Sequence, residues 1–369
     1  MIKWALKSLF RQYGSVTGSA LGIASALILV IFFDAVWRGE SDQIIAYPNN
    51  VKPDVWVMQS GVANMHMAMS FVWDWKARKI AEMPEVKKVT PIIYLNTVIS
   101  AGDTKMFAFI VGLLPNAKRA GPWEISAGRR MHGPKEVIMP DVLSKLTGIE
   151  IGEKLNITDR QFTVVGLSKG TYSSANAVLF VPFDDLEDIL SSFGTYSYLL
   201  VDAHDGVNPK DLAGKIRNQI EKINALSHDE FIQNDYSMAR QMGVEIIIMM
   251  TIICSVLAAL IVCFSAYSLV MRKRHEIAII KALGFSNKSI FISVIIQSSI
   301  ITLIGFVLAM AFALFVVPYI PLIIPQLTIS VSIDALIQLG FIAFIVAIFG
   351  ALIPTFMVVK MDPATAFHV

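Results

Sequence analysis

Four long stretches of the chain carry almost no charged residues, and they constrain its fold more than any other feature. A bilayer core about 30 Å thick requires about 20 apolar residues in a helix that rises about 1.5 Å per residue. The stretches are residues 16–37, 244–271, 290–317 and 333–359. Between residues 38 and 243 no stretch is apolar for long enough to span. The sequence therefore predicts an α-helical membrane protein with four transmembrane helices.

The composition agrees with this prediction. Hydrophobic residues make up 55% of the chain and charged residues 16%, and the mean hydropathy is +0.60. An ordinary soluble domain is more polar than this. The two cysteines, Cys254 and Cys263, lie in one apolar stretch. They suggest neither a disulfide framework nor a metal site, and we expect them to fill space between helices or to face lipid.

Lysine and arginine in short flanking segments predict the orientation, because such residues tend to stay on the cytoplasmic side. The loop 318–332 has none. We therefore expect a multi-pass membrane protein with both termini and the segment 272–289 cytoplasmic and residues 38–243 outside, and with 318–332 as a short outer loop. The basic residues that support this are Lys3, Lys7, Arg11, Arg272, Lys273, Arg274, Lys281, Lys288 and Lys360.

The ends of the chain carry two smaller predictions. Residues 1–15 place apolar and basic side chains on opposite helical faces, which predicts a cytoplasmic amphipathic helix at the inner interface. A cleaved signal peptide is the alternative for residues 1–37. The apolar stretch is longer than a signal core, however, and no small-residue cleavage pattern follows it. Residues 360–369 are expected to form a cytoplasmic tail.

Residues 38–243 alternate short apolar runs with Gly, Pro and Asp, which predicts a folded α+β extracytoplasmic domain inserted between the first two transmembrane helices. Pairs at 102–103 and 159–160 are typical of hairpin turns. A helix from about residue 236 is expected to continue into the second span as a stalk. Predicted strands are 54–58, 86–100, 105–113, 136–139, 154–158, 161–167, 177–181 and 197–202, and predicted helices are 71–83 and 209–224.

A group of soft and aromatic side chains follows the first apolar stretch. One interpretation is a membrane-proximal segment whose Met and Trp residues rest on the lipid interface or the stalk. The other is a lipophilic substrate site, in which thioethers, an imidazole and aromatic faces receive an acyl chain, a porphyrin or a soft metal. The candidate contact residues are Met58, Met65, His66, Met67, Met69 and Trp73, with Phe71 and Trp75 beside them.

No catalytic site can be assembled from the sequence. Residues 128–135, GRRMHGPK, look like a phosphate-binding loop, but Pro134 precedes the lysine and no Ser or Thr follows it. The six histidines are scattered, and no zinc spacing or nucleophile elbow is present. We expect no catalytic residue, no metal site, no cofactor bound by this chain and no nucleic-acid partner.

Three segments resemble the FtsX-like permease family, which includes MacB-type and haem-exporter-type members, and the resemblance covers nearly the whole chain. The most specific segment is 271–285, MRKRHEIAIIKALGF. Residues 360–364, KMDPA, are similar to the family's C-terminal signature. Residues 151–157, IGEKLNI, with 161–166, QFTVVG, resemble a hairpin of the MacB-like periplasmic core domain.

The resemblance implies a segment, 272–289, that docks on a separate ATP-binding cassette subunit, where ATP and Mg would be bound. Arg272, Arg274, Glu276, Lys281 and Gly284 are the expected coupling residues, with Gly284 ending the helix. A basic loop that only sets topology is the alternative. The resemblance also implies a second permease copy, as a homodimer or a related heterodimer, and a location in the bacterial cytoplasmic (inner) membrane. It leaves open whether a periplasmic adaptor takes part.

The expected function is that of an ABC exporter's permease subunit without its own ATPase. ATP hydrolysis by the partner would drive export or extraction of a lipophilic substrate: a lipid, a lipoprotein, a haem-like molecule, or a hydrophobic peptide or drug. One alternative is a non-transporting mechanotransmission subunit that activates an extracytoplasmic enzyme. Another is a membrane-anchored sensor that has no ATPase partner.

Overall fold

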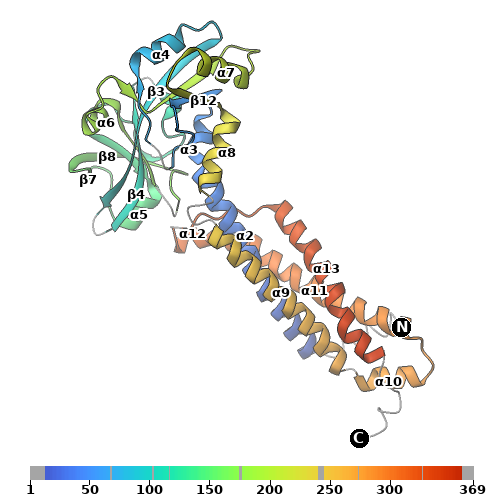
Figure 1. Cartoon of the computed structure of the whole chain (residues 1–369). Helices are drawn as coiled ribbons and strands as arrows, with labels where there is room; N and C mark the ends of the chain where they lie inside the picture. The colour runs from blue at the N-terminus through green and yellow to red at the C-terminus, as the bar shows by residue number, and fades with distance from the viewer. Residues whose placement is uncertain are drawn as a thin grey trace. The chain divides into compact units, whose positions relative to one another are not determined.

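The computed structural model describes residues 13–66, 69–101, 104–115, 117–173, 177–239, 245–272, 274–325 and 327–359 (Figure 1). The chain divides into two compact units. The helical unit comprises residues 1–38, 246–320 and 329–369, and the α/β unit comprises residues 39–245 and 321–328. Most of the predicted helix 1–15, the turn at 102–103, the start of the stalk at 240–244 and the tail 360–369 lie outside the described residues.

The long helices coincide closely with the apolar stretches of the sequence. Within the described residues, three helices are long and apolar enough to cross a membrane, over Val16–Ile44, Ile248–Ser265 and Asn287–Ile323. By the same measure, Ile333–Ile345 is a shorter apolar segment. It is the first part of the helix that occupies the fourth predicted span. The elements are α2 (Tyr13–Ile44), α9 (Glu245–Arg272), α10 (Arg274–Ala282), α11 (Asn287–Phe315), η3 (Val317–Tyr319), α12 (Ile320–Ile323) and α13 (Ile333–Val359).

Two glycines of α11 and α13 show how closely the helices of this unit pack. A Cβ atom added to Gly305 would lie 2.8 Å from Cγ2 of Ile23 and 3.0 Å from the carbonyl oxygen of Ala20, both on α2. A Cβ added to Gly340 would lie 2.5 Å from the Phe306 ring. Small residues at such crossings let membrane helices approach and gain van der Waals contact. Glycine therefore sets the α2–α11 and α11–α13 contacts.

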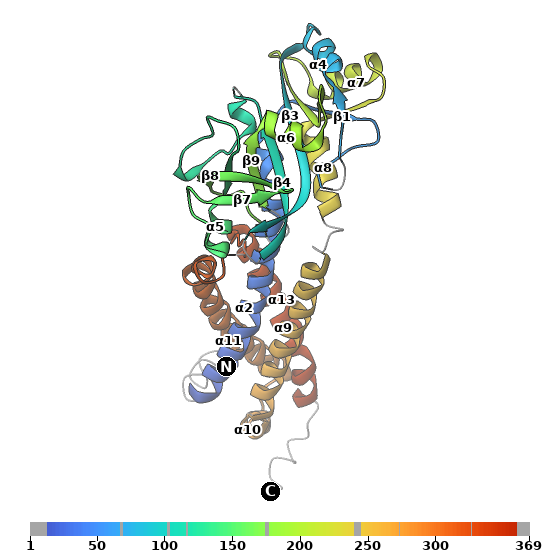
Figure 2. The same ribbon diagram turned by 90° about the vertical axis from the view of Figure 1, so that its left-hand side faces the viewer.

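A ten-stranded mixed sheet forms the centre of the α/β unit (Figure 2). Its order is β12-β1-β11-β3-β4-β9-β6-β8-β5, with β7 pairing to β3 and β8, and β2 pairs with β10 in a separate ribbon. The strands are β1 (Val55–Gln59), β2 (Val72–Trp73), β3 (Val86–Ala101), β4 (Thr104–Leu113), β5 (Ile125–Gly128), β6 (Glu136–Pro140), β7 (Lys154–Ile157), β8 (Arg160–Ser168), β9 (Ala177–Pro182), β10 (Thr195–Tyr196), β11 (Tyr198–Ala203) and β12 (Ile223–Ser227).

The long strand β3 joins the two halves of this sheet. Its first half pairs with β11 and its second half with β4. Because side chains alternate across a strand, Ile92 and Tyr94 enter one apolar cluster, whereas Ile93 and Leu95 enter another on the opposite face. Both faces of the sheet are therefore buried.

Short helices cover these clusters. α3 and α8 supply Tyr47 and Phe231 to the first cluster, and α5 and α6 supply Leu143 and Leu186 to the second. α4 and α7 cover a third cluster beside β1 and β11 and lie next to each other in both views (Figures 1 and 2). The helices are α3 (Ala46–Val51), η1 (Lys118–Ala120), α4 (Asp74–Ala81), α5 (Asp141–Thr147), α6 (Phe183–Leu190), α7 (Pro209–Gln219) and α8 (His228–Ala239).

Three local predictions need correction. The helix expected over 71–83 starts only at Asp74, because Val72 and Trp73 pair with β10. The helix expected over 209–224 ends at Gln219, and strand β12 follows it. The turn between β7 and β8 is formed by Thr158 and Asp159, both with positive φ, one position earlier than expected.

Candidate functional site

The segment between α9 and α11 is the first candidate site, and its glycine determines where α10 ends. Gly284 has φ +88°. Its N–H donates to the carbonyl of Lys281 at 3.0 Å, and the Phe285 N–H donates to the carbonyl of Ile280 at 3.4 Å. This pair of bonds is a Schellman motif, which glycine favours because it has no Cβ. The role predicted for Gly284 as the helix end follows from this geometry.

α10 has one buried side and one exposed apolar edge. Ile277 is buried and, with Ile280, packs against Ile290 and Val294 of α11. Ile279, on the same helix, is 40% exposed. Leu283 and Phe285 are 72% and 45% exposed. The segment thus presents an apolar edge that its own unit does not cover.

The expected coupling residues lie in α10 or next to it in the chain. Arg272 is the last residue of α9 and is exposed, and Arg274 is the first residue of α10. Glu276 lies exposed in the first turn of α10, where a carboxylate is favoured by the helix dipole. Lys281 lies in the last turn and is partly buried. An apolar edge flanked by charges of both signs is suited to binding another protein.

The second candidate group separates into buried and exposed members. Met58 in β1, Met65 and His66 are buried, with exposed fractions of 0%, 3% and 3%. Met69 and Trp73 are 41% and 55% exposed. Met67 lies outside the described residues. The sequence cluster is therefore two features, a buried pocket and a surface patch.

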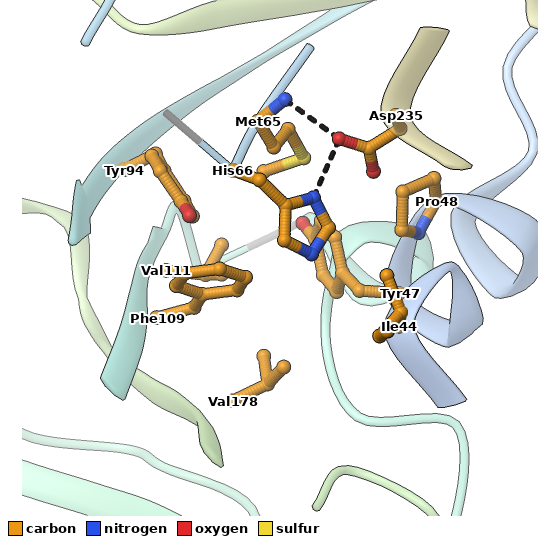
Figure 3. A pocket seen from close by; sticks show the side chains of 10 residues that line it. All are labelled: Ile44, Tyr47, Pro48, Met65, His66, Tyr94, Phe109, Val111, Val178 and Asp235. Atoms are coloured by element: carbon orange, nitrogen blue, oxygen red, sulfur yellow. Dashed lines mark hydrogen bonds and ion pairs between the residues drawn. The ribbon is translucent and has the colours of Figure 1, made fainter. Parts of the chain in front are cut away.

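His66 is held in the pocket by a carboxylate from α8. Its Nδ1 lies 2.6 Å from Oδ1 of Asp235, and the same oxygen accepts the Met65 N–H at 3.0 Å (Figure 3). Both side chains are almost fully buried. His66 Nε2 and Asp235 Oδ2 have no hydrogen-bond partner among the described residues. A carboxylate on Nδ1 of a histidine leaves Nε2 free to accept a hydrogen bond or to bind a ligand.

Aromatic rings and aliphatic side chains form the remaining walls of this pocket. The His66 ring meets Phe109 edge-on, with ring centroids 5.0 Å apart. The cavity measures about 10 Å³, which is room for roughly one water molecule. A porphyrin or an acyl chain does not fit this conformation. The lining residues are Ile44, Tyr47, Pro48, Met65, His66, Tyr94, Phe109, Val111, Val178 and Asp235 (Figure 3).

The pocket tyrosines keep their protons. Burial raises the pKa of Tyr47, whose hydroxyl donates to the carbonyl of Ala120 at 3.1 Å. Burial also raises the pKa of Tyr94, and neighbouring groups that include Asp235 raise it further. Both hydroxyls are therefore neutral at physiological pH, and that of Tyr94 has no hydrogen-bond partner among the described residues.

The surface patch consists of aromatic side chains around β2 and β10. Trp73 pairs across the ribbon with Thr195, and Asp74 N–H donates to the carbonyl of Gly194 at 3.0 Å. Trp75 is 49% exposed, and the Lys76 ammonium lies 5.5 Å from its ring centroid. Phe71 and Phe193 are 43% and 64% exposed. Sequence reasoning missed Phe193, because it lies far along the chain from the Trp residues.

The segment that looks like a phosphate-binding loop has a structural explanation. Glu136 accepts hydrogen bonds from Arg129 and from the N–H groups of His132 and Gly133. The Arg129 hydrogen bond, followed by these backbone donors, lowers the pKa of Glu136 to about 2. The backbone donors of the loop are thus already bound to a carboxylate. Among the described residues, no group of three or more His, Cys, Asp or Glu side chains could hold a metal ion.

Comparison with known families accounts for both units. Residues 14–219 match the MacB-like periplasmic core domain, which is more than half of the chain. Residues 248–363 match the FtsX-like permease C-terminal domain. This chain belongs to the FtsX-like ABC transporter permease family. The permease match contains α10, and the periplasmic-domain match contains the aromatic patch and every lining residue of the His66 pocket except Asp235.

Relatives share modest identity over much of the permease chain. An uncharacterized ABC transporter permease of Mycobacterium tuberculosis is 23% identical over 85% of this chain and 84% of its own length. A putative hemin transport system permease protein, HrtB, of Staphylococcus epidermidis is 27% identical over 64% of this chain and 65% of its own. The pyoverdine export ATP-binding/permease protein PvdT of Pseudomonas aeruginosa is 21% identical over 97% of this chain and 56% of its own.

Among solved structures, the periplasmic region of MacB from Actinobacillus actinomycetemcomitans is similar to part of the permease. The similarity covers 52% of this chain and 96% of that chain, at 14% identity and a TM-score of 0.39.

Proposed function

We propose that this permease is the membrane subunit of an ABC exporter whose ATP hydrolysis takes place on a separate subunit. The family assignment supports this, as do relatives named for hemin transport and pyoverdine export. In this proposal α13, which is helical over Ile333–Val359, is the fourth span. The distribution of lysine and arginine supports a cytoplasmic α10 and an α/β unit on the outer side of a bacterial inner membrane.

The exposed apolar edge of α10 carries the proposal. Leu283 is 72% exposed beside the turn that Gly284 fixes. Monomeric proteins seldom leave such side chains grouped on a surface without a partner. We assign this edge, together with Glu276, Arg272 and Arg274, to contact with an ATP-binding cassette subunit. Burial of the edge there would stabilise the complex, and the flanking charges would select the partner.

A second permease copy completes the proposed assembly. In α9, only 11% of the window Ile248–Ser265 is buried within this chain, compared with 39% for the window in α2. The side chains exposed there are apolar, such as Ile252, Val256 and Leu260. This surface is available to lipid or to a second copy, as an ATP-driven pair of permeases requires.

The proposed cycle transmits force rather than solute through the chain. Binding of ATP closes the partner subunits, displaces α10 and moves the helices that lead into the α/β unit. The substrate is a lipophilic molecule that this unit drives outward. For its contacts we propose the exposed residues Met69 and Trp73, with Met58, Met65 and His66 reached only if the pocket opens.

The deciding experiment is co-purification of this chain with a co-expressed ATP-binding cassette subunit, followed by measurement of ATP hydrolysis. We expect a stable complex in which Glu276→Ala lowers activity at least about tenfold, since a charged interface contact is lost. Glu150→Ala, a change of the same size at an exposed site in the α/β unit, serves as the control. Failure of any such subunit to associate would support the sensor alternative.

Substrate contact is tested with hemin as the probe. Hemin is expected to quench tryptophan fluorescence. The double variant Met69→Leu/Trp73→Leu should bind hemin at least about threefold more weakly than wild type. Phe107→Leu, at a residue 61% exposed on β4, is the matched control. If wild type, the double variant and Phe107→Leu bind hemin equally, the aromatic patch does not contact the substrate.

A further inference from the structure

A short segment between α11 and α13, which includes most of α12, groups with the α/β unit. This segment, residues 321–328, is here called the strap, and α11 before it and α13 after it belong to the helical unit. The chain therefore passes between the units after residues 38, 245, 320 and 328. Two of these passages flank the strap. Sequence reasoning treated 318–332 only as a short outer loop.

A buried glutamate of α2 holds the strap. Oε1 of Glu40 accepts the N–H of Thr328 at 3.1 Å. Glu40 is only 3% exposed. Five residues earlier in α2, the carbonyl of Ala35 accepts the N–H of Ser330 at 3.0 Å. Two hydrogen bonds thus attach one continuous helix to the same segment, one within each unit.

The turn of α2 that carries Glu40 is also bound to the sheet. Gln43 donates from Nε2 to the carbonyl of Gly170, in the turn after β8. Burial, together with the charge of Glu40, raises the pKa of the nearby Tyr172. A buried carboxylate is costly unless its hydrogen bonds are made. Glu40 is therefore placed for its contacts rather than for packing alone.

We propose that Glu40 is a positioning residue that clamps the strap to α2, so that α11 and α13 act directly on the α/β unit. This rests on the proposed function, in which helix movement drives that unit. In addition to α2 and α9, the strap then provides a third mechanical connection. With Glu40 in place, α2 and the strap move as one body; without it, the strap follows only α11 and α13.

Hydrogen exchange of the purified full-length chain in lipid nanodiscs tests the clamp without any partner. Glu40→Ala should speed exchange at Thr328 at least about tenfold, since a hydrogen bond to a charged group is lost. Glu40→Gln retains an oxygen acceptor and should stay within about threefold of wild type. Exchange in β8 should not change. Equal exchange at Thr328 in all three proteins would overturn the clamp.

A second variant guards against loss of the fold. If Glu40→Ala also loses protection in β8, Thr328→Pro removes the donor N–H from the strap and leaves the buried carboxylate in place. Faster exchange at Leu327 and Ser330 in Thr328→Pro, with β8 still protected, supports the clamp. Unchanged exchange at both positions contradicts it.

The mechanical role is tested in the complex with the ATP-binding subunit. Nucleotide binding should change exchange in the α/β unit, and Glu40→Ala should reduce that change at least about threefold while Glu40→Gln restores it. A merely structural role would alter basal exchange but not the nucleotide-dependent part. Absence of any nucleotide effect in wild type would contradict the proposed function, whereas the nanodisc result would still decide the clamp.

Discussion

Asp235 of α8 binds the His66 imidazole at 2.6 Å, across 169 positions of sequence, in the interior of the α/β unit. The same carboxylate oxygen accepts the backbone N–H of Met65. α8 is the last described helix before α9, and Tyr47 of the pocket belongs to α3, which directly follows α2. The pair therefore joins α8 to the loop after β1, in a pocket that Tyr47 of α3 also lines.

Removing one member of this pair should destabilise the α/β unit. Asp235→Ala leaves a buried imidazole and the Met65 N–H without their acceptor, at a cost of roughly 3 kcal/mol. The measurement is chemical unfolding of the purified chain in detergent, monitored by tryptophan fluorescence. Asp205→Ala, at an exposed aspartate, should be almost neutral. Equal stability of the two variants would show that the pair contributes little.

The ion pair between Glu136 and Arg129 predicts a loss of stability in acid. The folded pKa of Glu136, about 2, lies below its ordinary value of 4.5. Its contribution to stability is therefore fully present above about pH 4.5 and is lost as pH falls toward 2. Half of Arg129 is exposed, so solvent reduces the effect. Thermal unfolding from pH 6 to pH 3 should show a smaller decrease for Glu136→Gln than for wild type, and parallel curves would contradict this.

The helices and most strands follow from sequence because their patterns are local. The stretch 333–359 was predicted with the bounds that α13 has, since uncharged apolar runs have few alternatives to a helix. β12 was missed because the residues before it continue the helical pattern of α7, and only pairing with β1 makes Ile223–Ser227 a strand. Tertiary pairing overrode local propensity there.

The candidate sites were only partly accessible from sequence. Gly284 was predicted to end α10 because a glycine after a periodic segment is a local signal. Asp235 could not be matched to His66, nor Thr328 to Glu40, because these partners are distant in sequence and no spacing rule connects them. The Met and His residues looked like one cluster because they lie close together in the sequence, but β1 and the following loop bury Met58 and His66 while leaving Trp73 exposed.

The helix contact at Gly305 should tolerate no side chain. Gly305→Ala would place a Cβ 2.8 Å from Ile23 and 3.0 Å from a backbone oxygen of α2. Overpacking of this kind costs about 1–3 kcal/mol. Gly22→Ala, whose Cβ would lie 3.8 Å from its neighbour, is the matched control and should be neutral. Thermal unfolding in detergent compares them, and a Gly305→Ala protein as stable as Gly22→Ala would contradict the close contact.

The exposed edge of α10 predicts where association with an ATP-binding subunit fails. Leu283→Asp places a charge at the centre of that edge, and burying an unpaired carboxylate in an interface opposes binding. We expect affinity for the subunit to fall at least about tenfold, measured by titration of the purified subunit onto the chain in nanodiscs. Phe193→Asp makes a comparable change at another exposed apolar site, in the α/β unit, and should leave affinity unchanged. Because Leu283 is 72% exposed, the substitution does not disturb the core. An equal loss of affinity in Leu283→Asp and Phe193→Asp would contradict direct binding through α10 and would mean that the two units communicate.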